Sequence, residues 1–238
     1  MGENLVSFYT RNIKIEWKYA FYGAFVSCLL IHLYKFTNTL PNHDSFFNVY
    51  TNQDMTVSGR WFLQYACGLC SYFDLPWLNG LLCSVWLGFT AAIVVELFEV
   101  KNPVVIVLSS IVLSATPSTT ETLFFEFTAD GYFLGLMLSS LAACLSSKGK
   151  NWKDHLLAGV SLCLACGIYQ AYVSFAGVLC ICYLVLKLLD GAMSVQGSWK
   201  WVAKHILIYG LSLAVYYGIW KLVFISNRAN RNKQPGNQ

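Results

Sequence analysis

Charged residues are scarce in this 238-residue sequence, in which Lys, Arg, Asp and Glu together make up 12%. An ordinary soluble domain carries roughly twice that share, because a folded chain of this length must cover a large surface with polar side chains. Hydrophobic residues make up 56%, and the mean hydropathy is +0.52. These values exclude a soluble domain, a disordered chain, a coiled coil, collagen and a small disulfide scaffold. The sequence is therefore that of a polytopic membrane protein.

Three further absences narrow the class. The formal net charge of +4 is too small to argue for a nucleic-acid partner. The apolar stretch after the basic residues 1–18 lacks a small-residue cleavage site and is too long for the core of a signal peptide. Neither Cys67-x-x-Cys70 nor Cys163-x-x-Cys166 has a His or a further Cys nearby to complete a metal site. We therefore expect packing roles for the nine cysteines and no cofactor, with a divalent metal left open.

The apolar stretches predict an all-α, polytopic transmembrane helical bundle of about seven spans, since a bilayer core needs about 20 mostly apolar residues per helix. The stretch 156–189 is too long for one helix, and we divide it near Gly167–Gln170. The expected spans are 17–36, 75–98, 104–119, 131–145, the two halves of 156–189, and 201–225. Residues 61–74 are apolar but short, and predict an interfacial helix within the first outer loop, 37–74. The transmembrane domain is thus 1–225, and the polar, basic tail 226–238 is expected to be disordered.

The distribution of basic residues predicts the orientation. With the N-terminus in the cytoplasm, before the last span only Lys35 and Arg60 fall outside. The residues that then fall inside are Arg11, Lys14, Lys18, Lys101, Lys148, Lys150, Lys153, Lys187, Lys200 and Lys204. Half of the twelve acids gather at the outer face, namely Asp44, Asp54, Asp74, Glu121, Glu126 and Asp130. Because half of the acids gather there, we expect the chemistry of this protein to take place at the outer face of the membrane.

The first outer loop carries residues suited to group transfer. Asp44 or Asp54 can act as a general base on a hydroxyl, and the planar fork of Arg60 matches the oxygens of a phosphate. Gly59 would let the backbone bring Arg60 close to a ligand. The alternative is a solvated loop in which Arg60 and Trp61 are ordinary membrane anchors.

A second outer segment, 119–130, combines hydroxyls, carboxylates and aromatic rings of the kind that bind sugars. Its candidate residues for contact with a sugar or an acceptor are Glu121, Glu126 and Asp130, joined by Tyr169 and Gln170 at another outer turn. The alternative is a short amphipathic loop whose acids are merely solvated, with acids favoured at the start of the following helix.

Three short motifs carry a family resemblance. They are Ser-Gly-Arg-Trp-Phe at 58–62, Phe-Thr-Ala-Asp-Gly-Tyr at 127–132 and Gly-Ile-Tyr-Gln-Ala at 167–171. Together with the charged N-terminus and the first outer loop, they resemble the N-terminal half of the bacterial and phage-borne O-antigen glucosyltransferases of the Gtr type, which are polytopic and GT-C-like. Members of that family are considerably longer.

The resemblance implies a function in the bacterial inner membrane. Such enzymes transfer glucose from a polyprenyl-phosphate carrier to a surface polysaccharide or lipid-linked glycan, with inversion, and depend on a flippase and a donor-synthesising transferase as partners. Asp44 matches the essential acid of the first outer loop, with Asp54 as the second choice and Arg60 on the donor phosphate. The acids of that loop are often adjacent or one residue apart in GT-C enzymes, whereas Asp44 and Asp54 are well separated here.

A non-enzymatic polytopic protein, such as a flippase-like carrier or an assembly subunit, is the alternative function. A carrier is expected to have broken or polar helices at the bilayer midplane and internal repeats. The sequence shows few charges at that depth and no evident repeat, which favours chemistry at the membrane surface.

Overall fold

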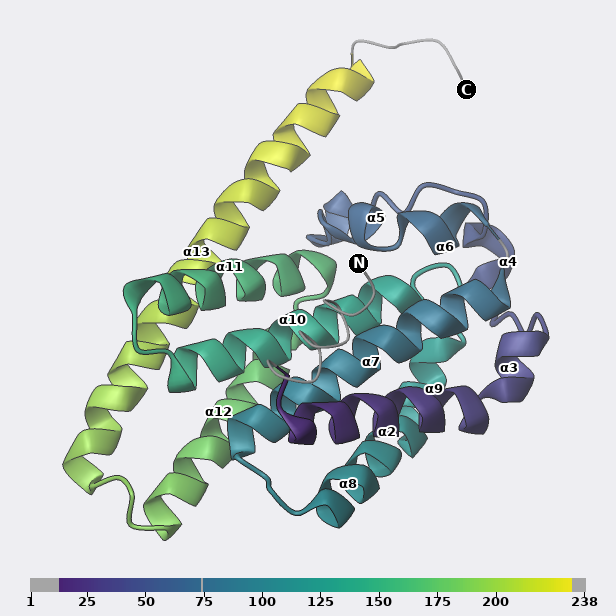
Figure 1. Ribbon diagram of the computed structural model, residues 1–238. Coiled ribbons are helices and arrows are strands. Elements are labelled where there is room, and N and C mark those ends of the chain that lie inside the picture. The colour runs from purple at the N-terminus through teal and green to yellow at the C-terminus, as the bar shows by residue number, and fades with distance from the viewer. Residues whose placement is uncertain (1–12, 74, 233–238) are drawn as a thin grey trace, which may run out of the picture.

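The chain folds as an all-α bundle, which confirms the predicted fold class. The computed structural model describes residues 13–73 and 75–232, and every regular element within these residues is a helix (Figure 1). The long helices are α2 (Ile15–Ile31), α7 (Pro76–Phe98), α8 (Pro103–Ala115), α10 (Ala129–Lys148), α11 (Trp152–Ile168), α12 (Tyr172–Leu189) and α13 (Val195–Asn232). The short ones are α3 (Leu33–Thr37), α4 (Ser45–Asn48), η1 (Thr56–Ser58), α5 (Leu63–Ala66), α6 (Gly68–Tyr72) and α9 (Pro117–Leu123).

Proline and capping residues determine where several helices begin. α8 begins at Pro103, which costs no hydrogen bond in the first turn, and the side chain of Asn102 accepts from two N–H groups of that turn. α9 begins at Pro117 in the same way, with Thr116 as its capping residue. Asn151 starts α11 with a capping box. These signals are local, so the sequence alone indicates these helix starts.

Among the described residues, four helices are long and apolar enough to cross a membrane, namely α7, α10, α12 and α13 as far as Asn227. A fifth crossing results if α8 and α9 form one span, bent by 49°. α2 and α11 have 17 residues each, slightly fewer than the roughly 20 that a hydrocarbon core needs. The helices thus indicate a membrane protein, and the number of seven spans stays a prediction.

The expected break within 156–189 is confirmed. α11 ends at Ile168 and α12 begins at Tyr172, so a tight turn separates two antiparallel helices. Residues 61–74 form no spanning helix, because α5 and α6 have only four and five residues. The first expected span is interrupted at His32, from which α3 continues.

The last helix continues past the predicted end of the last span. α13 extends to Asn232, whereas the sequence predicts a span that ends at residue 225 and disorder in 226–238, of which 233–238 lie outside the described residues. Residues 226–232 contain no glycine or proline to end a helix, so polarity alone is not sufficient to stop it. The 38 residues of α13 make a helix about 57 Å long. Its last turns project beyond the bundle (Figure 1).

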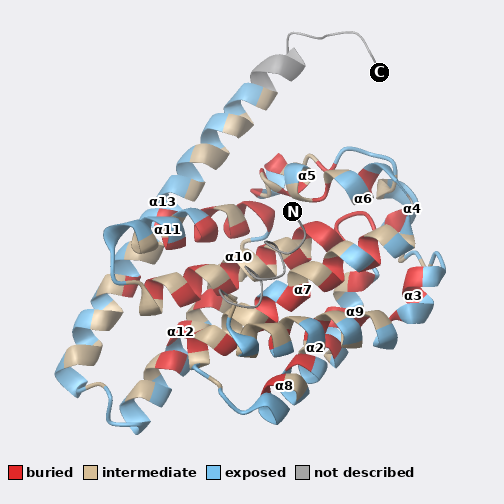
Figure 2. Cartoon of the chain, in the orientation of Figure 1, coloured by how far each residue is buried: buried red, intermediate tan, exposed pale blue. Residues whose placement is uncertain are grey.

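α7 lies at the centre of the bundle. α2 and α10 pack on α7, α8 packs on α2, α11 and α12 pack on α10, and α13 packs on α11. Small residues allow the close approach, since Ala20, Ala24 and Cys28 form the buried face of α2 and Gly88 of α7 lies under the ring of Phe21. Figure 2 shows buried residues concentrated on α7 and α10, while α13 is largely exposed.

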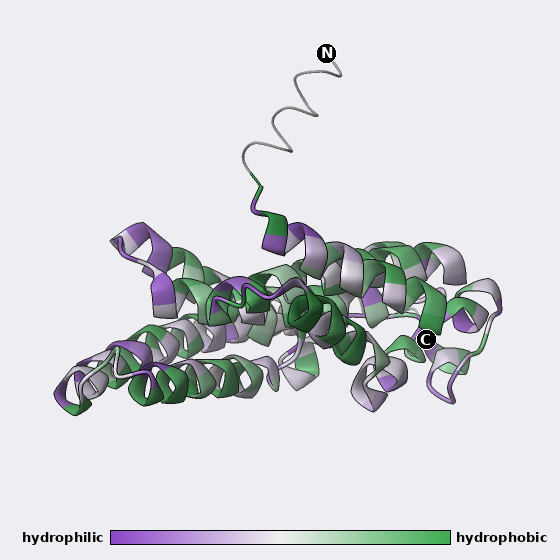
Figure 3. Cartoon of the chain, turned by 60° about the horizontal axis from the view of Figure 1, so that its bottom comes forward, coloured by the Kyte–Doolittle hydropathy of each residue, from purple (hydrophilic) through white to green (hydrophobic). Residues whose placement is uncertain are grey.

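One end of the bundle carries an ion-pair network, which we call the Lys14 end. The Nζ atom of Lys14 is 2.7 Å and that of Lys148 is 3.1 Å from the carboxylate of Glu96. Glu99 lies 3.1 Å from the Nζ atoms of both Lys148 and Lys187. These charges come from the start of α2 and the ends of α7, α10 and α12, so the helices alternate in direction. Figure 3 shows hydrophilic residues at helix ends and in loops, and hydrophobic residues along the helices.

Candidate functional site

The three sequence motifs at 58–62, 127–132 and 167–171 meet in space at the end of the bundle opposite the Lys14 end. The N–H of Phe62 donates to the carbonyl of Gly167 at 2.9 Å, and Nε2 of Gln170 donates to the carbonyl of Ser58 at 2.7 Å. Nη1 of Arg60 donates to the hydroxyl of Tyr132 at 3.2 Å. Contacts between residues 72 to 112 positions apart in the sequence therefore build one site.

Glycines let these segments approach. A Cβ atom on Gly167 would lie 2.9 Å from the side chains of Trp61 and Phe62, and one on Gly131 would lie 3.1 Å from that of Cys67. Burial, with a smaller contribution from the nearby charge of Asp130, raises the pKa of the Cys67 thiol to about 12. Cys67 therefore stays a neutral thiol that packs beneath the site, as predicted for this cysteine.

A tight turn presents Arg60. Met55 and Arg60 are paired, with the N–H of Arg60 donating to the carbonyl of Met55 at 3.1 Å, and η1 fills the turn between them. Gly59 has a φ of +85°, in the left-handed region that favours glycine. A side chain there would also collide with Gln170 and Tyr216.

Replacing Gly59 with alanine is therefore expected to lower the free energy of unfolding by about 1–2 kcal/mol, the cost of a side chain in left-handed backbone. Thermal unfolding of the purified chain in detergent measures this. Gly68→Ala is the matched control, because no other atom lies within 4 Å of the added Cβ, and it should leave the midpoint unchanged. Equal midpoints for the two variants would contradict the strain assigned to Gly59.

Arg60 is held by aromatic residues. Its guanidinium carbon lies 4.4 Å from the centroid of the Tyr169 ring, in addition to the bond from Nη1 to Tyr132. Its Nε atom is buried and has no hydrogen-bond partner among the described residues, and the same is true of Nε1 of Trp61. Unpartnered buried donors are costly, so the site favours an acceptor such as a phosphate oxygen. We call Arg60, Tyr132, Tyr169, Gln170 and Tyr216 the Arg60 cluster.

The last helix supports this cluster. The hydroxyl of Tyr216 donates to the carbonyl of Gly59 at 3.0 Å and accepts from Nε2 of Gln170 at 2.9 Å. One turn later, Nε1 of Trp220 donates to the carbonyl of Thr56 at 2.7 Å. Tyr132, Tyr216 and Trp220 are not among the predicted site residues. The feature that could have indicated them is a polar atom on an aromatic ring in an apolar helix.

Asp54 and Asp44 occupy different surroundings. Oδ1 of Asp54 accepts from the N–H of Thr56 at 3.2 Å and from its hydroxyl, and Oδ2 accepts from Asn227 of α13 at 3.3 Å. Asp54 directly precedes the paired turn that presents Arg60. The side chain of Asp44 is 60% exposed and lies 3.7 Å from Nδ1 of His43. The described contacts thus connect Asp54 to the turn that bears Arg60, and leave Asp44 at the surface of the same loop.

Glu126 is buried and anchors the start of the first outer loop. It forms an ion pair with Lys35, which is also buried, and Oε1 accepts from the N–H of Leu40 at 3.1 Å. Its backbone carbonyl accepts from Nδ2 of Asn79 at 2.7 Å. A buried ion pair of this kind fixes one arrangement, because separating either partner would leave an uncompensated charge. Lys35 has no predicted role from the sequence, beyond its expected position on the outer side of the membrane.

The remaining candidate residues differ in burial. Asp130 is 3% exposed and lies in the first turn of α10, where its Oδ1 accepts from the N–H of Gly131 at 2.9 Å. Such a position favours an acid. Glu121 is exposed and lies within α9. Among the described residues, no group of three or more His, Cys, Asp and Glu side chains is arranged to hold a metal ion.

Comparison with known proteins indicates a family. A family model with the description "Glucosyl transferase GtrII" matches residues 33–237, which include the first outer loop, the three motifs and α13. No curated protein and no solved structure matches the chain.

Proposed function

The chain belongs to the GtrII glucosyl transferase family, and from that premise we propose that it transfers glucose from a polyprenyl phosphate to a surface polysaccharide such as O-antigen. The observation that carries this proposal is the Arg60 cluster, with its buried and unpartnered Nε atom. A phosphate group is the acceptor that a planar guanidinium matches best. Family membership also favours a glycosyltransferase over a non-enzymatic carrier or assembly subunit.

In the proposed reaction, a hydroxyl oxygen of the acceptor attacks the anomeric carbon of glucose. The bond from that carbon to the phosphate oxygen breaks, and the configuration inverts. Asp54 takes the hydroxyl proton, with Asp44 as the second candidate. The leaving polyprenyl phosphate gains a negative charge, which Arg60 stabilises.

The sugar is proposed to lie against the aromatic part of the cluster. The rings of Tyr132 and Tyr169 have centroids 6.0 Å apart, and Phe125 lies edge-on to Tyr132. Tyr169 and Gln170 are thus the best-supported contacts to the sugar. Exposed Glu121 and buried Asp130 stay candidates for the acceptor, while Glu126 acts on the loop through its pair with Lys35.

The proposed reaction is at the outer face of the bacterial inner membrane. Basic side chains gather at the Lys14 end, which the positive-inside rule assigns to the cytoplasm. The loop residues 38–73 and the end of α13 lie at the other end, and we propose that donor and acceptor meet there, outside the membrane, as in GT-C enzymes. A flippase and a donor-synthesising transferase would supply the lipid-linked glucose.

Labelling tests this orientation. Val57 is 67% exposed in the outer loop, and Lys101 is exposed at the Lys14 end. In a chain without its nine native cysteines, a membrane-impermeant maleimide added to spheroplasts should label Val57→Cys and not Lys101→Cys. The reverse pattern would contradict the outer location of the Arg60 cluster.

Reconstituted activity tests the function. The full chain in proteoliposomes is incubated with polyprenyl-phosphate glucose that carries radiolabelled glucose, and with an O-antigen glycan. Label is expected in the glycan fraction and free polyprenyl phosphate in equal amount. Hydrolysis of the donor without labelled glycan, or no consumption of the donor at all, would contradict the proposal.

A further inference from the structure

The buried ion pair between Lys35 and Glu126 also binds the backbone of the first outer loop. The two residues are 8% and 7% exposed, and Nζ of Lys35 lies 5.5 Å from the centroid of the Phe124 ring. The same Nζ donates to the carbonyl of Leu40 at 3.0 Å, while Oε1 of Glu126 accepts from the N–H of Leu40 at 3.1 Å. Both backbone groups of one loop residue are therefore bound by the pair.

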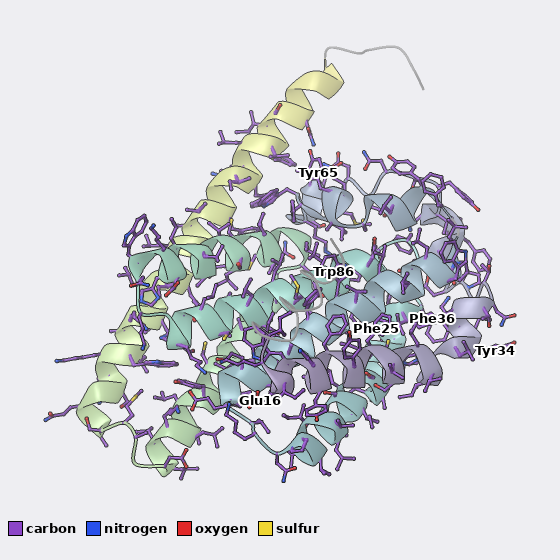
Figure 4. The ribbon with its side chains drawn as sticks, in the orientation of Figure 1. Glu16, Phe25, Tyr34, Phe36, Tyr65 and Trp86 are labelled. Atoms are coloured by element: carbon purple, nitrogen blue, oxygen red, sulfur yellow. The ribbon has the colours of Figure 1, made fainter. Side chains whose placement is uncertain are left out.

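The helix α3 carries Lys35 and is seated on α7. The ring of Phe36 fills the space beside Gly80 of α7, where a Cβ atom would overlap it, whereas Tyr34 is 70% exposed. Figure 4 shows Phe36 between α3 and α7, and Tyr34 at the edge of the molecule. The packing of Phe36 therefore fixes the helix from which Lys35 reaches Glu126.

The residues that follow Glu126 hold the loop at two further points. The carbonyl of Phe127 accepts from the hydroxyl of Ser71 in α6 at 2.8 Å, and Ser71 is buried. The hydroxyl of Tyr132 accepts from Nη1 of Arg60 at 3.2 Å. Glu126, Phe127 and Tyr132 thus contact the start, the end and the middle of the same loop.

Stability alone does not account for this pair. Two apolar side chains of similar volume are often as stable as a buried ion pair, or more so. In addition, Oε2 of Glu126 is buried without a hydrogen-bond partner among the described residues, which is unfavourable. The pair differs from an apolar contact because its charged atoms bind both backbone groups of Leu40, so it specifies where the loop begins.

We propose that Lys35 and Glu126 are positioning residues for glucosyl transfer. They bind the start of the outer loop to the segment whose Tyr132 contacts Arg60, so the loop and the guanidinium are held in one arrangement. They act through the loop and not by contact with the substrate. The kinetic part of this inference rests on the proposed function, whereas the hold on Leu40 can be measured without turnover.

Two double variants test the proposal, and each removes both charges. Lys35→Met/Glu126→Gln keeps an amide oxygen that can accept from the N–H of Leu40. Lys35→Met/Glu126→Leu removes both side-chain partners of that residue and leaves an apolar contact, so it is expected to unfold at or above the midpoint of the first variant. A lower kcat in the second variant can then not result from a loss of stability.

In proteoliposomes, Lys35→Met/Glu126→Leu is expected to transfer labelled glucose with a kcat about tenfold below that of Lys35→Met/Glu126→Gln. The reason is that a misplacement of about 1 Å at a reacting group can lower the rate as much as a hundredfold. Equal kcat values for the two variants would overturn the proposal.

Coupling to Tyr132 separates positioning from a purely structural role. In the wild type, Tyr132→Phe removes the contact with Arg60 and is expected to lower kcat about fivefold. In the Lys35→Met/Glu126→Leu background, the same change should lower kcat less than twofold, because residues that act on one arrangement are not additive. A fivefold loss in both backgrounds would show that the pair does not act through Tyr132, and would overturn the proposal.

Amide hydrogen exchange distinguishes a failure of this inference from a failure of the proposed function. The N–H of Leu40 should exchange about fivefold faster in Lys35→Met/Glu126→Leu than in Lys35→Met/Glu126→Gln, the effect of one ordinary hydrogen bond, while the N–H groups of α7 exchange equally in both. Equal exchange at Leu40 would overturn the inference and leave the proposed function untouched. Faster exchange at Leu40 together with no glucose transfer by the wild type would instead overturn the proposed function and the kinetic part that rests on it.

Discussion

Replacing Arg60 with lysine is expected to lower kcat about a hundredfold, the usual effect of removing one donor that stabilises charge in a transition state. A lysine keeps the positive charge, but it cannot lie flat on the Tyr169 ring and direct several N–H groups in one plane. The buried Nε atom of Arg60 has no partner among the described residues, so its hydrogen bond is available to the leaving phosphate. Transfer of labelled glucose in proteoliposomes measures the change.

Two further variants separate this role from a structural one. Tyr132→Phe removes only the hydroxyl that accepts from Nη1, and should lower kcat about fivefold, the worth of one ordinary hydrogen bond. Arg60→Ala should regain part of its activity when guanidinium chloride is added, because the free ion can occupy the emptied position. A kcat for Arg60→Lys within twofold of that of the wild type would show that Arg60 does not touch the phosphate.

Replacing Asp54 with asparagine is expected to lower kcat about a thousandfold, within the range assigned to general bases, while Asp44→Asn changes it less than threefold. The described contacts give the reason. Asp54 precedes the turn that presents Arg60 and is oriented by Thr56 and Asn227, whereas Asp44 is exposed beside His43. A side chain held at the reacting atoms is a better base than one free in solvent.

Thr56→Val and thermal unfolding complete this test. The valine keeps the carboxylate of Asp54 but removes the hydroxyl that donates to it, so a small loss of kcat is expected with an unfolding midpoint close to that of the wild type. If Asp44→Asn loses activity and Asp54→Asn does not, the base is Asp44, and the contacts of Asp54 serve only to attach α13 to the outer loop.

The helix α13 has a role that its composition does not reveal. Its apolar residues predict only a last span, yet Tyr216 and Trp220 bind the backbone of the turn before Arg60. The tail beyond residue 225 is polar, which predicts disorder. The structure continues the helix to Asn232 and brings Asn227 to Asp54, because a helix that is already formed extends through residues that do not break it.

Several features follow from the sequence alone. The scarcity of charge identifies lipid as the solvent, and the apolar stretches predict the helices and the break near Gly167–Gln170 within 156–189. The three motifs in the sequence also indicate the family, and the matching family model confirms this resemblance. The sequence also predicts Arg60, Tyr169 and Gln170 as site residues.

Only the tertiary structure decided which of these residues meet. Arg60 and Tyr132 are 72 positions apart, Gln170 and Ser58 are 112 apart, and Trp220 and Thr56 are 164 apart. In a soluble helix the apolar stripe indicates the face that packs inward. A membrane helix is apolar on all sides, so the pattern that identifies it says nothing of its neighbours, which small residues and single hydrogen bonds select. The scarcity of charge thus identifies this chain as a membrane protein, but for the same reason the sequence does not show which residues lie beside Arg60.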